Sequence, residues 1–307
     1  MASPNTAHSP AEGQHQQQQT LTRVKGYHHD QEGGAKHPFR YNFKPHSTCF
    51  QTLKMITVGL ILFPLRMFTF IFFFIVLWLA ALASTCCGPS GSEFPKSQVI
   101  SRFFMRFASR MILWALGFWW ITTNGSPSTD APVVVANHVS FADPFFFAYA
   151  MFPMAVAKAE VLNMPLVGTI AKAQQTITVS RDSTKSRHEV AEEICRRTQW
   201  QQTQSEEVLK KHGKWPPLLI FPEATCTNTT SIIEFKLGAF TPLMPVQPVA
   251  LDFRQKHLDV SWVGNCPLPL TIVRMMCQVY NRLEVTYLPV MHPAKEGQQH
   301  RQGMEEE

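Results

Sequence analysis

The hydrophobic and polar positions divide the chain into a polar start, an apolar second segment and a region of short mixed elements. Residues 1–50 contain a run of four glutamines and few apolar side chains, a composition typical of disordered segments. The last residues, 294–307, are also polar. We therefore expect disordered tails over 1–50 and 294–307, membrane-embedded or interfacial helices over 51–125, and a folded domain over 126–293.

The stretch 55–83 is the most apolar part of the sequence and contains an uncharged run from Met67 to Ala83. About 20 apolar residues cross a bilayer as a helix, so the stretch is long enough to span a membrane. Pro64 is also able to kink the chain into a re-entrant hairpin. Basic residues flank the stretch on both sides, so their distribution indicates no orientation. Spanning and re-entrant insertion both remain open, and a buried helix of a soluble protein is the alternative to both.

The stretch 99–121 combines many aromatic residues with Arg102, Arg106 and Arg110. The arginines recur every four residues and therefore share one face of a helix. This pattern predicts a helix that lies in the lipid headgroup region. The alternative is a helix that packs on the folded domain with its arginines in solvent.

From residue 131 onward, short apolar runs alternate with helical patterns. Helices are expected over 143–151, from Pro165, and over 183–212, where Gly213 provides a stop. In the long helix, Glu192 with Arg196 and Glu193 with Arg197 have the spacing of ion pairs. Strands are expected over 132–136, 154–157, 176–180, 218–221, 246–251 and 283–288. This alternation predicts an α/β domain with a mostly parallel sheet flanked by helices.

Composition narrows the functional classes. The 307 residues carry a net charge of +6, which favours an anionic partner. No basic run of the nucleic-acid-binding type is present in the sequence, so phosphates and membrane lipids are the expected partners. None of the seven cysteines forms a C-x-x-C pair, and no metal-ligand cluster is apparent in the sequence. We therefore expect reduced thiols and no metal.

His138 and Asp143 lie five positions apart, directly after the first buried strand, at an expected strand-to-helix turn. A carboxylate on one imidazole nitrogen fixes the tautomer and raises the basicity of the other nitrogen. The pair thus predicts a general base that removes a proton from a hydroxyl group. The sequence has no G-x-S-x-G nucleophile elbow, so we expect a substrate hydroxyl to attack directly. The alternative is that Asp143 is a helix N-cap and His138 an ordinary loop residue.

A second polar segment runs from Glu223 through Thr225 to Asn228, after the strand at 218–221. Small and polar residues at the carboxyl end of a strand are typical of the ligand crevice of α/β sheets. Arg181 and Lys236 are cationic and each follows an expected strand. They are predicted to converge on one phosphate, and the alternative is that each is a surface charge.

Together these segments resemble the glycerolipid acyltransferase family, whose members are similar to 1-acylglycerol-3-phosphate acyltransferases. The family pattern is NHxxxxD, then an arginine at a strand end, then FPEGT, then an apolar strand with a proline. In this sequence the four segments are 137–143, 179–181, 221–225 and 246–249. FPEATCTN…FKLGAF, and ILFPLR at 61–66, resemble the lysophosphatidylcholine acyltransferase branch.

The resemblance implies a membrane-bound enzyme in which His138 deprotonates the free hydroxyl of a lysophospholipid and Asp143 orients His138. The hydroxyl would attack the thioester of acyl-CoA, which is a co-substrate, and no cofactor or nucleic acid is implied. By the same resemblance, Glu223 and Thr225 position the glycerol-phosphate part of the acceptor, while Arg181 and Lys236 hold its phosphate. The family also implies the endoplasmic reticulum or lipid droplets as the membrane, with the acyltransferase domain facing the cytosol.

Two residues depart from the family pattern. Ala224 replaces the glycine of FPEGT, which costs about 1 kcal/mol if that position requires a positive φ. Thr229 stands where the lysophosphatidylcholine branch commonly has arginine. These departures leave two alternatives open: an acyltransferase for 1-acylglycerol-3-phosphate or glycerol-3-phosphate, and an inactive membrane scaffold on the same fold.

Overall fold

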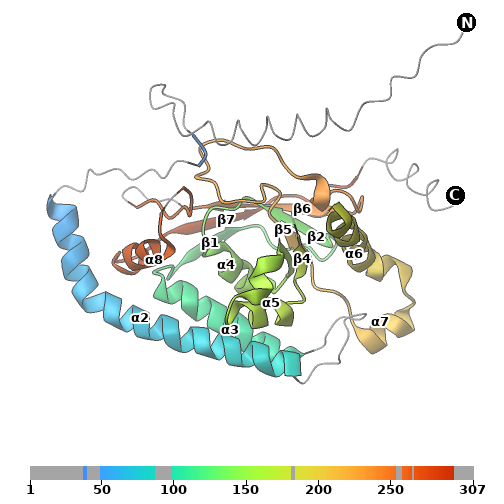
Figure 1. The fold of residues 1–307 in the computed structure, drawn as a ribbon, viewed down its shortest axis with the longest axis horizontal. Coiled ribbons are helices and arrows are strands. Elements are labelled where there is room, and N and C mark those ends of the chain that lie inside the picture. The colour runs from blue at the N-terminus through green and yellow to red at the C-terminus, as the bar shows by residue number, and fades with distance from the viewer. Residues whose placement is uncertain are drawn as a thin grey trace, which may run out of the picture. The chain divides into compact units, whose positions relative to one another are not determined.

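Seven short strands form one sheet. The strands are β1 (Ile121–Asn124), β2 (Val133–Ala136), β3 (Met154–Lys158), β4 (Ile177–Val179), β5 (Leu218–Ile220), β6 (Val246–Asp252) and β7 (Leu283–Tyr287). Their order is β1-β7-β6-β2-β5-β3-β4 (Figure 1). All neighbouring strands are parallel except β6 and β7. The mostly parallel α/β sheet predicted from the sequence is confirmed, and each of the six predicted strands is present to within one residue.

The computed structural model describes residues 37–39, 49–86, 98–180, 184–253, 258–264 and 266–293. All described helices and strands belong to one unit, residues 38–307. The tails predicted over 1–50 and 294–307 lie outside the described residues, apart from 37–39 and 49–50. The predicted phosphate ligand Arg181 also lies outside them.

Helices cover both faces of the sheet. They are α2 (Cys49–Cys86), α3 (Val99–Ala115), α4 (Asp143–Ala150), α5 (Val167–Ala173), α6 (Thr184–Thr203), α7 (Glu206–His212) and α8 (Leu268–Met276), with the short 3-10 helices η1 (Ala159–Asn163) and η2 (Leu237–Ala239). One apolar core joins one face of the sheet to α2, α3, α4 and α8, and a second core joins the other face to α6 and α7. Alternate residues of β2 point into the two cores: Val134 into the first, Val133 and Val135 into the second. The central strand is therefore buried on both faces, as its continuous apolar run indicates.

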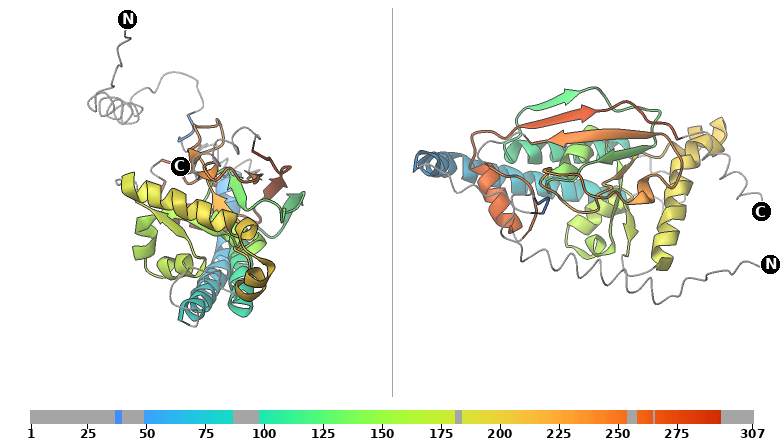
Figure 2. Two further views of the ribbon diagram at one scale, coloured as in Figure 1. Left: turned by 90° about the vertical axis from the view of Figure 1, so that its right-hand side faces the viewer. Right: turned by 90° about the horizontal axis from the view of Figure 1, so that it is seen from above.

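The apolar helix α2 packs beside α3 and continues through Pro64 (Figures 1 and 2). It bends without folding back on itself (Figure 1), so Pro64 does not produce a hairpin within this stretch. Arg66 is almost fully buried, and its guanidinium donates hydrogen bonds to three carbonyls at the end of α8, those of Met276, Gln278 and Val279. The last carbonyls of a helix have no partner within the helix, and Arg66 satisfies that of Met276 together with two carbonyls of the segment that follows α8.

The arginines of α3 contact the folded domain, and the placement of α3 in the lipid headgroup region stays a prediction. Arg106 donates hydrogen bonds to the carbonyls of Tyr149 and Ala150 at the end of α4. Arg110 donates to those of Phe118 and Trp119, and Arg102 lies over the ring of Phe152. The exposed apolar side chains of α3 are Val99, Ile100, Phe103, Phe104 and Phe107. The arginine face thus binds the domain, and an apolar face is exposed.

Two further predictions are corrected, and two elements had not been predicted. The helix expected over 183–212 is two helices, because the chain leaves the helical conformation at Ser205, which is extended with φ −67° and ψ 157°. The predicted pair of Glu193 with Arg197 is confirmed. The predicted pair of Glu192 with Arg196 is wrong, because Arg196 also pairs with Glu193 and Glu192 pairs with His188. Strand β1 and helix α8 were not predicted. Strand β1 lies at the edge of the sheet, has four mostly exposed residues and lacks the apolar run by which the other strands were predicted.

Candidate active site

The two segments with candidate chemistry meet because β2 and β5 are parallel neighbours. Val135 of β2 lies in register with Ile220 of β5. Parallel neighbours end at the same edge of a sheet, so His138 and Glu223 follow strands that end side by side. The side-chain amide of Asn137 fastens this edge to β6, since it donates to the Leu251 carbonyl at 2.9 Å and accepts from the Leu251 N–H at 2.8 Å.

His138 and Asp143 form a hydrogen-bonded pair. The Nδ1 atom of His138 lies 2.9 Å from Oδ2 of Asp143, and Asp143 is fully buried. The same Oδ2 atom accepts the backbone N–H groups of Val139 at 2.7 Å and Ser140 at 2.9 Å. Asp143 is the first residue of α4 and not its N-cap, which is Ala142, and its carboxylate binds the turn before the helix together with the imidazole. The predicted contact between His138 and Asp143 is present, whereas the N-cap alternative is wrong.

The environment of His138 favours its protonated form. Burial lowers the pKa of the imidazole, but the hydrogen bonds and charges of Asp143 and Cys226 outweigh burial and raise the pKa to about 10. The ring stacks on Phe221, with 4.2 Å between the ring centroids. Its side chain keeps 21% exposure, so a substrate atom is able to reach the imidazole.

The segment after β5 turns sharply beside His138. The N–H of Thr227 donates to the carbonyl of His138 at 2.8 Å, and the hydroxyl of Thr227 donates to the Glu223 carboxylate at 2.8 Å. Glu223 is buried, and burial raises the pKa of its carboxyl group. Ala224 has φ +56°, and Thr229 has φ +58°. Both departures from the family pattern thus occupy the left-handed region, where side chains with a Cβ are strained.

The remaining predicted residues differ in their placement. Thr225 is exposed beside Glu223. The backbone N–H of Lys236 donates to the Pro222 carbonyl at 2.8 Å, which places Lys236 next to this segment, and its side chain is exposed. Arg181 follows β4, a strand that β5 and β3 separate from β2. Four further residues contribute to the site without a predicted role, namely Asn137, Phe221, Cys226 and Thr227. In the sequence, only their position inside the two motifs indicated that they belong to the site.

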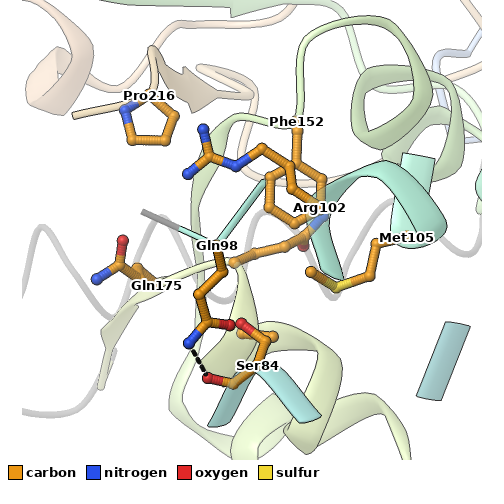
Figure 3. Close-up of a pocket in the computed structure, with 9 residues that line it drawn as sticks. Ser84, Gln98, Arg102, Met105, Phe152, Gln175 and Pro216 are labelled. Carbon is orange, nitrogen blue, oxygen red and sulfur yellow. Dashed lines mark hydrogen bonds between the residues drawn. The ribbon is translucent and has the colours of Figure 1, made fainter. Parts of the chain in front are cut away.

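The described residues contain no cluster of three or more histidine, cysteine or acidic side chains that could bind a metal ion. A small cavity lies away from His138, where the end of α2 and the start of α3 meet the segment after α5 (Figure 3). At its wall the Gln98 side chain donates to the Ser84 carbonyl at 2.7 Å. None of the predicted site residues lines this cavity. The candidate chemistry therefore lies at the sheet edge around His138.

This arrangement suits the activation of a hydroxyl group. The Nδ1 atom of His138 is engaged by Asp143, which leaves Nε2 as the nitrogen for a substrate. A buried carboxylate, Glu223, and a threonine lie on the neighbouring strand end. The family model named Acyltransferase matches residues 121–252, a range that holds His138, Asp143 and Glu223.

The chain belongs to the acyltransferase family. The chain is 35% identical to the lysophospholipid acyltransferase LPEAT2 of Arabidopsis thaliana, over 85% of the chain and 47% of the relative. It is 34% identical to the mouse lysophosphatidylcholine acyltransferase 2, over 80% of the chain and 44% of the relative. The chain thus spans about half the length of these curated relatives. Among solved structures, the 1-acyl-sn-glycerophosphate acyltransferase PlsC of Thermotoga maritima is similar over 83% of the chain and 93% of its own length, with a TM-score of 0.49 and 15% identity.

Proposed function

We propose that this acyltransferase moves a fatty acyl group from acyl-CoA to the free hydroxyl of a lysophospholipid, with a lysophosphatidylcholine-like acceptor. The observation that carries the proposal is the His138–Asp143 pair at the end of β2, with Nδ1 and Oδ2 2.9 Å apart. The names of relatives that are 34–35% identical support the class of acceptor.

In the proposed mechanism, Nε2 of neutral His138 takes the proton from the acceptor hydroxyl as its oxygen attacks the carbonyl carbon of the thioester. The imidazolium that forms is stabilised by Asp143, which accepts the Nδ1–H. The carbon–sulfur bond then breaks, the proton passes from His138 to the CoA sulfur, and the ester and free CoA leave. No covalent acyl-enzyme is needed.

The acceptor is proposed to lie along the segment after β5. Glu223 and Thr225 would position the glycerol part, while Lys236 and Arg181 would hold the phosphate. The placement of Lys236 supports this role, because its backbone pairs with Pro222 while its ammonium group is exposed. A cationic side chain in that position suits a phosphate group.

Membrane attachment is proposed to come from α2 and α3. The part of α2 from Met55 to Cys86 is long and apolar enough to cross a membrane. A stripe of exposed apolar side chains runs along α2 from Leu53 to Leu82 and continues onto α3 at Phe103 and Phe107. A water-soluble protein rarely exposes so large an apolar surface, so lipid is the proposed contact. We propose the endoplasmic reticulum or a lipid droplet as the membrane, with the domain on the cytosolic side.

The test is acyl transfer from oleoyl-CoA in membranes that contain the expressed protein. The acceptors are lysophosphatidylcholine, lysophosphatidylethanolamine, 1-acylglycerol-3-phosphate and glycerol-3-phosphate, and the control variant is His138→Ala. The expected result is a phospholipid product that disappears in His138→Ala. Full activity of that variant would refute the mechanism. If no acceptor gives a product, the proposed enzyme activity is refuted and the inactive membrane scaffold is the alternative that stands. A preference for glycerol-3-phosphate would refute the lysophospholipid acceptor.

A further inference from the structure

Two loops hold the backbone around His138. The N–H of Thr227 donates to the carbonyl of His138 at 2.8 Å, and the N–H of Trp262 donates to the carbonyl of Val139 at 2.9 Å. The first loop, residues 223–228, carries Glu223 and Thr225 and is called the acceptor loop below. The second, residues 258–264, follows β6. Both loops thus depend on contacts with the segment that contains the proposed base.

A third segment, residues 37–39, bridges these two loops. The carbonyl of Pro38 accepts the N–H of Asn228 at 2.9 Å. The carbonyl oxygen of Phe39 lies 3.2 Å from the place that a Cβ atom on Gly264 would occupy. Gly264 has φ +62° and no side chain, which allows this close approach. Figure 1 shows the segment, in blue, against the loop that precedes α8.

We propose that Pro38 and Phe39 act as a positioning strap that holds the acceptor loop against His138. The acceptor loop needs such a support because Ala224 inside it and Thr229 directly after it have positive φ values, a costly conformation for residues other than glycine. The strap adds a hydrogen bond at Asn228, between these two positions. The role in catalysis rests on the proposed function, whereas the role in holding the loop does not.

The kinetic test replaces Pro38 and Phe39 by glycine in the full chain. The matched control replaces Gln31 and Glu32 by glycine, which makes the same change earlier in the chain. Glycine keeps the carbonyl at position 38 but makes the backbone around it more flexible, so the hydrogen bond to Asn228 is less often formed and kcat/KM for the lysophospholipid is expected to fall about fivefold. The KM for acyl-CoA is expected to stay unchanged, because the proposed function assigns acyl-CoA no contact with the acceptor loop. An unchanged kcat/KM in the strap variant would overturn the positioning role.

A second test needs no activity. Cys226 lies in the acceptor loop and is buried, whereas Cys195 lies on α6 and is partly exposed. Alkylation of Cys226 by iodoacetamide, followed by mass spectrometry, is expected to be several-fold faster in the strap variant, since a thiol reacts only when it is accessible. Labelling of Cys195 serves as the internal control. Equal labelling of Cys226 in both proteins would overturn the strap. If the natural chain transfers no acyl group at all, the proposed function fails, and this labelling experiment still decides whether the strap exists.

Discussion

The Oδ2 atom of Asp143 accepts the Nδ1–H of His138 and also two backbone N–H groups, those of Val139 and Ser140. One carboxylate therefore fixes the turn after β2 and the orientation of the proposed base. The turn and the base are coupled, so a change at Asp143 is expected to affect the reaction more than a change at any other carboxylate described.

Asp143→Asn is expected to lower kcat by about 100-fold or more, in the range by which general-base catalysis usually contributes. An amide has no charge with which to stabilise the imidazolium, and it keeps nearly the same volume. The measurement is the initial rate of acyl transfer at saturating acyl-CoA. The control is Asp130→Asn, a change at an exposed carboxylate. A rate within twofold of the parent protein would show that Asp143 has no part in the reaction.

The rate of acyl transfer is expected to rise with pH well above neutrality. His138 is active as a base only when it is neutral, and its pKa is raised to about 10, because Asp143 and Cys226 outweigh the opposing effect of burial. The profile of kcat/KM against pH should therefore have an apparent pKa above 6.5. In Asp143→Asn the apparent pKa should fall. A wild-type profile that is flat from pH 7 to pH 9 would contradict the prediction.

Stability should respond to pH in the opposite sense. The pKa of folded His138, about 10, lies above the ordinary value of 6.5, so protonation favours the folded state. This contribution is complete below pH 6.5 and is lost as the pH rises towards 10. The melting temperature in detergent should fall over that interval, and it should fall less in His138→Gln. Parallel curves for the two proteins would exclude His138 as the source.

Ala224→Gly is expected to raise the free energy of unfolding by about 1 kcal/mol, because Ala224 has φ +56° and glycine adopts this conformation without strain. The comparison is Ala155→Gly in β3, where the same change should destabilise the protein. Thermal unfolding of both variants in the same detergent checks the sign. A loss of stability in Ala224→Gly would mean that the methyl group makes a favourable contact.

Arg66→Met is expected to lower the free energy of unfolding by roughly 2–4 kcal/mol. Three buried or partly buried carbonyls at the end of α8 lose their donor, and each such hydrogen bond contributes about 1 kcal/mol. Arg282→Met, a change at an exposed side chain, should alter stability by less than about 0.5 kcal/mol. Equal effects of the two substitutions would show that Arg66 does not fasten α2 to the domain.

In the variant Phe103→Cys, the new thiol should react slowly with a water-soluble maleimide in intact membranes. Phe103 is 64% exposed on the apolar face of α3, and in the proposed arrangement lipid covers that face. A cysteine placed at Lys210, on α7, should react readily. Detergent should abolish the difference. Rapid labelling at position 103 without detergent would place that face of α3 in water.

Local patterns account for the parts of the fold that the sequence predicted well. The six strands were recognisable as short apolar runs, and the His138–Asp143 contact spans only five residues, within one turn. The long helix over 183–212 was wrong because its helical pattern continues past Ser205, where the chain becomes extended. Strand β1 has no apolar run, and only its pairing with β7 identifies it.

For the candidate site, the sequence predicted which residues take part, whereas the contacts between them depend on the fold. The motifs named His138, Asp143 and Glu223, but the hydrogen bond from Thr227 to Glu223 and the stacking of His138 on Phe221 depend on how β5 leads into its loop. The predicted role of Arg181 as a phosphate ligand stays a prediction, because Arg181 lies outside the described residues.

The sequence by itself determined that an apolar helical segment precedes an α/β domain and that a histidine and an aspartate meet after its first buried strand. These features follow from the spacing of apolar and polar residues over short stretches of the sequence, which is readable without the tertiary structure. The tertiary structure decided that Arg106 of α3 binds two carbonyls at the end of α4, that Arg66 binds the Met276 carbonyl of α8, and that Pro38 contacts Asn228. Each of these contacts joins a donor to a backbone carbonyl far away in the chain, and every residue offers such a carbonyl. Periodicity shows which face a side chain occupies, and only packing decides which carbonyl it reaches.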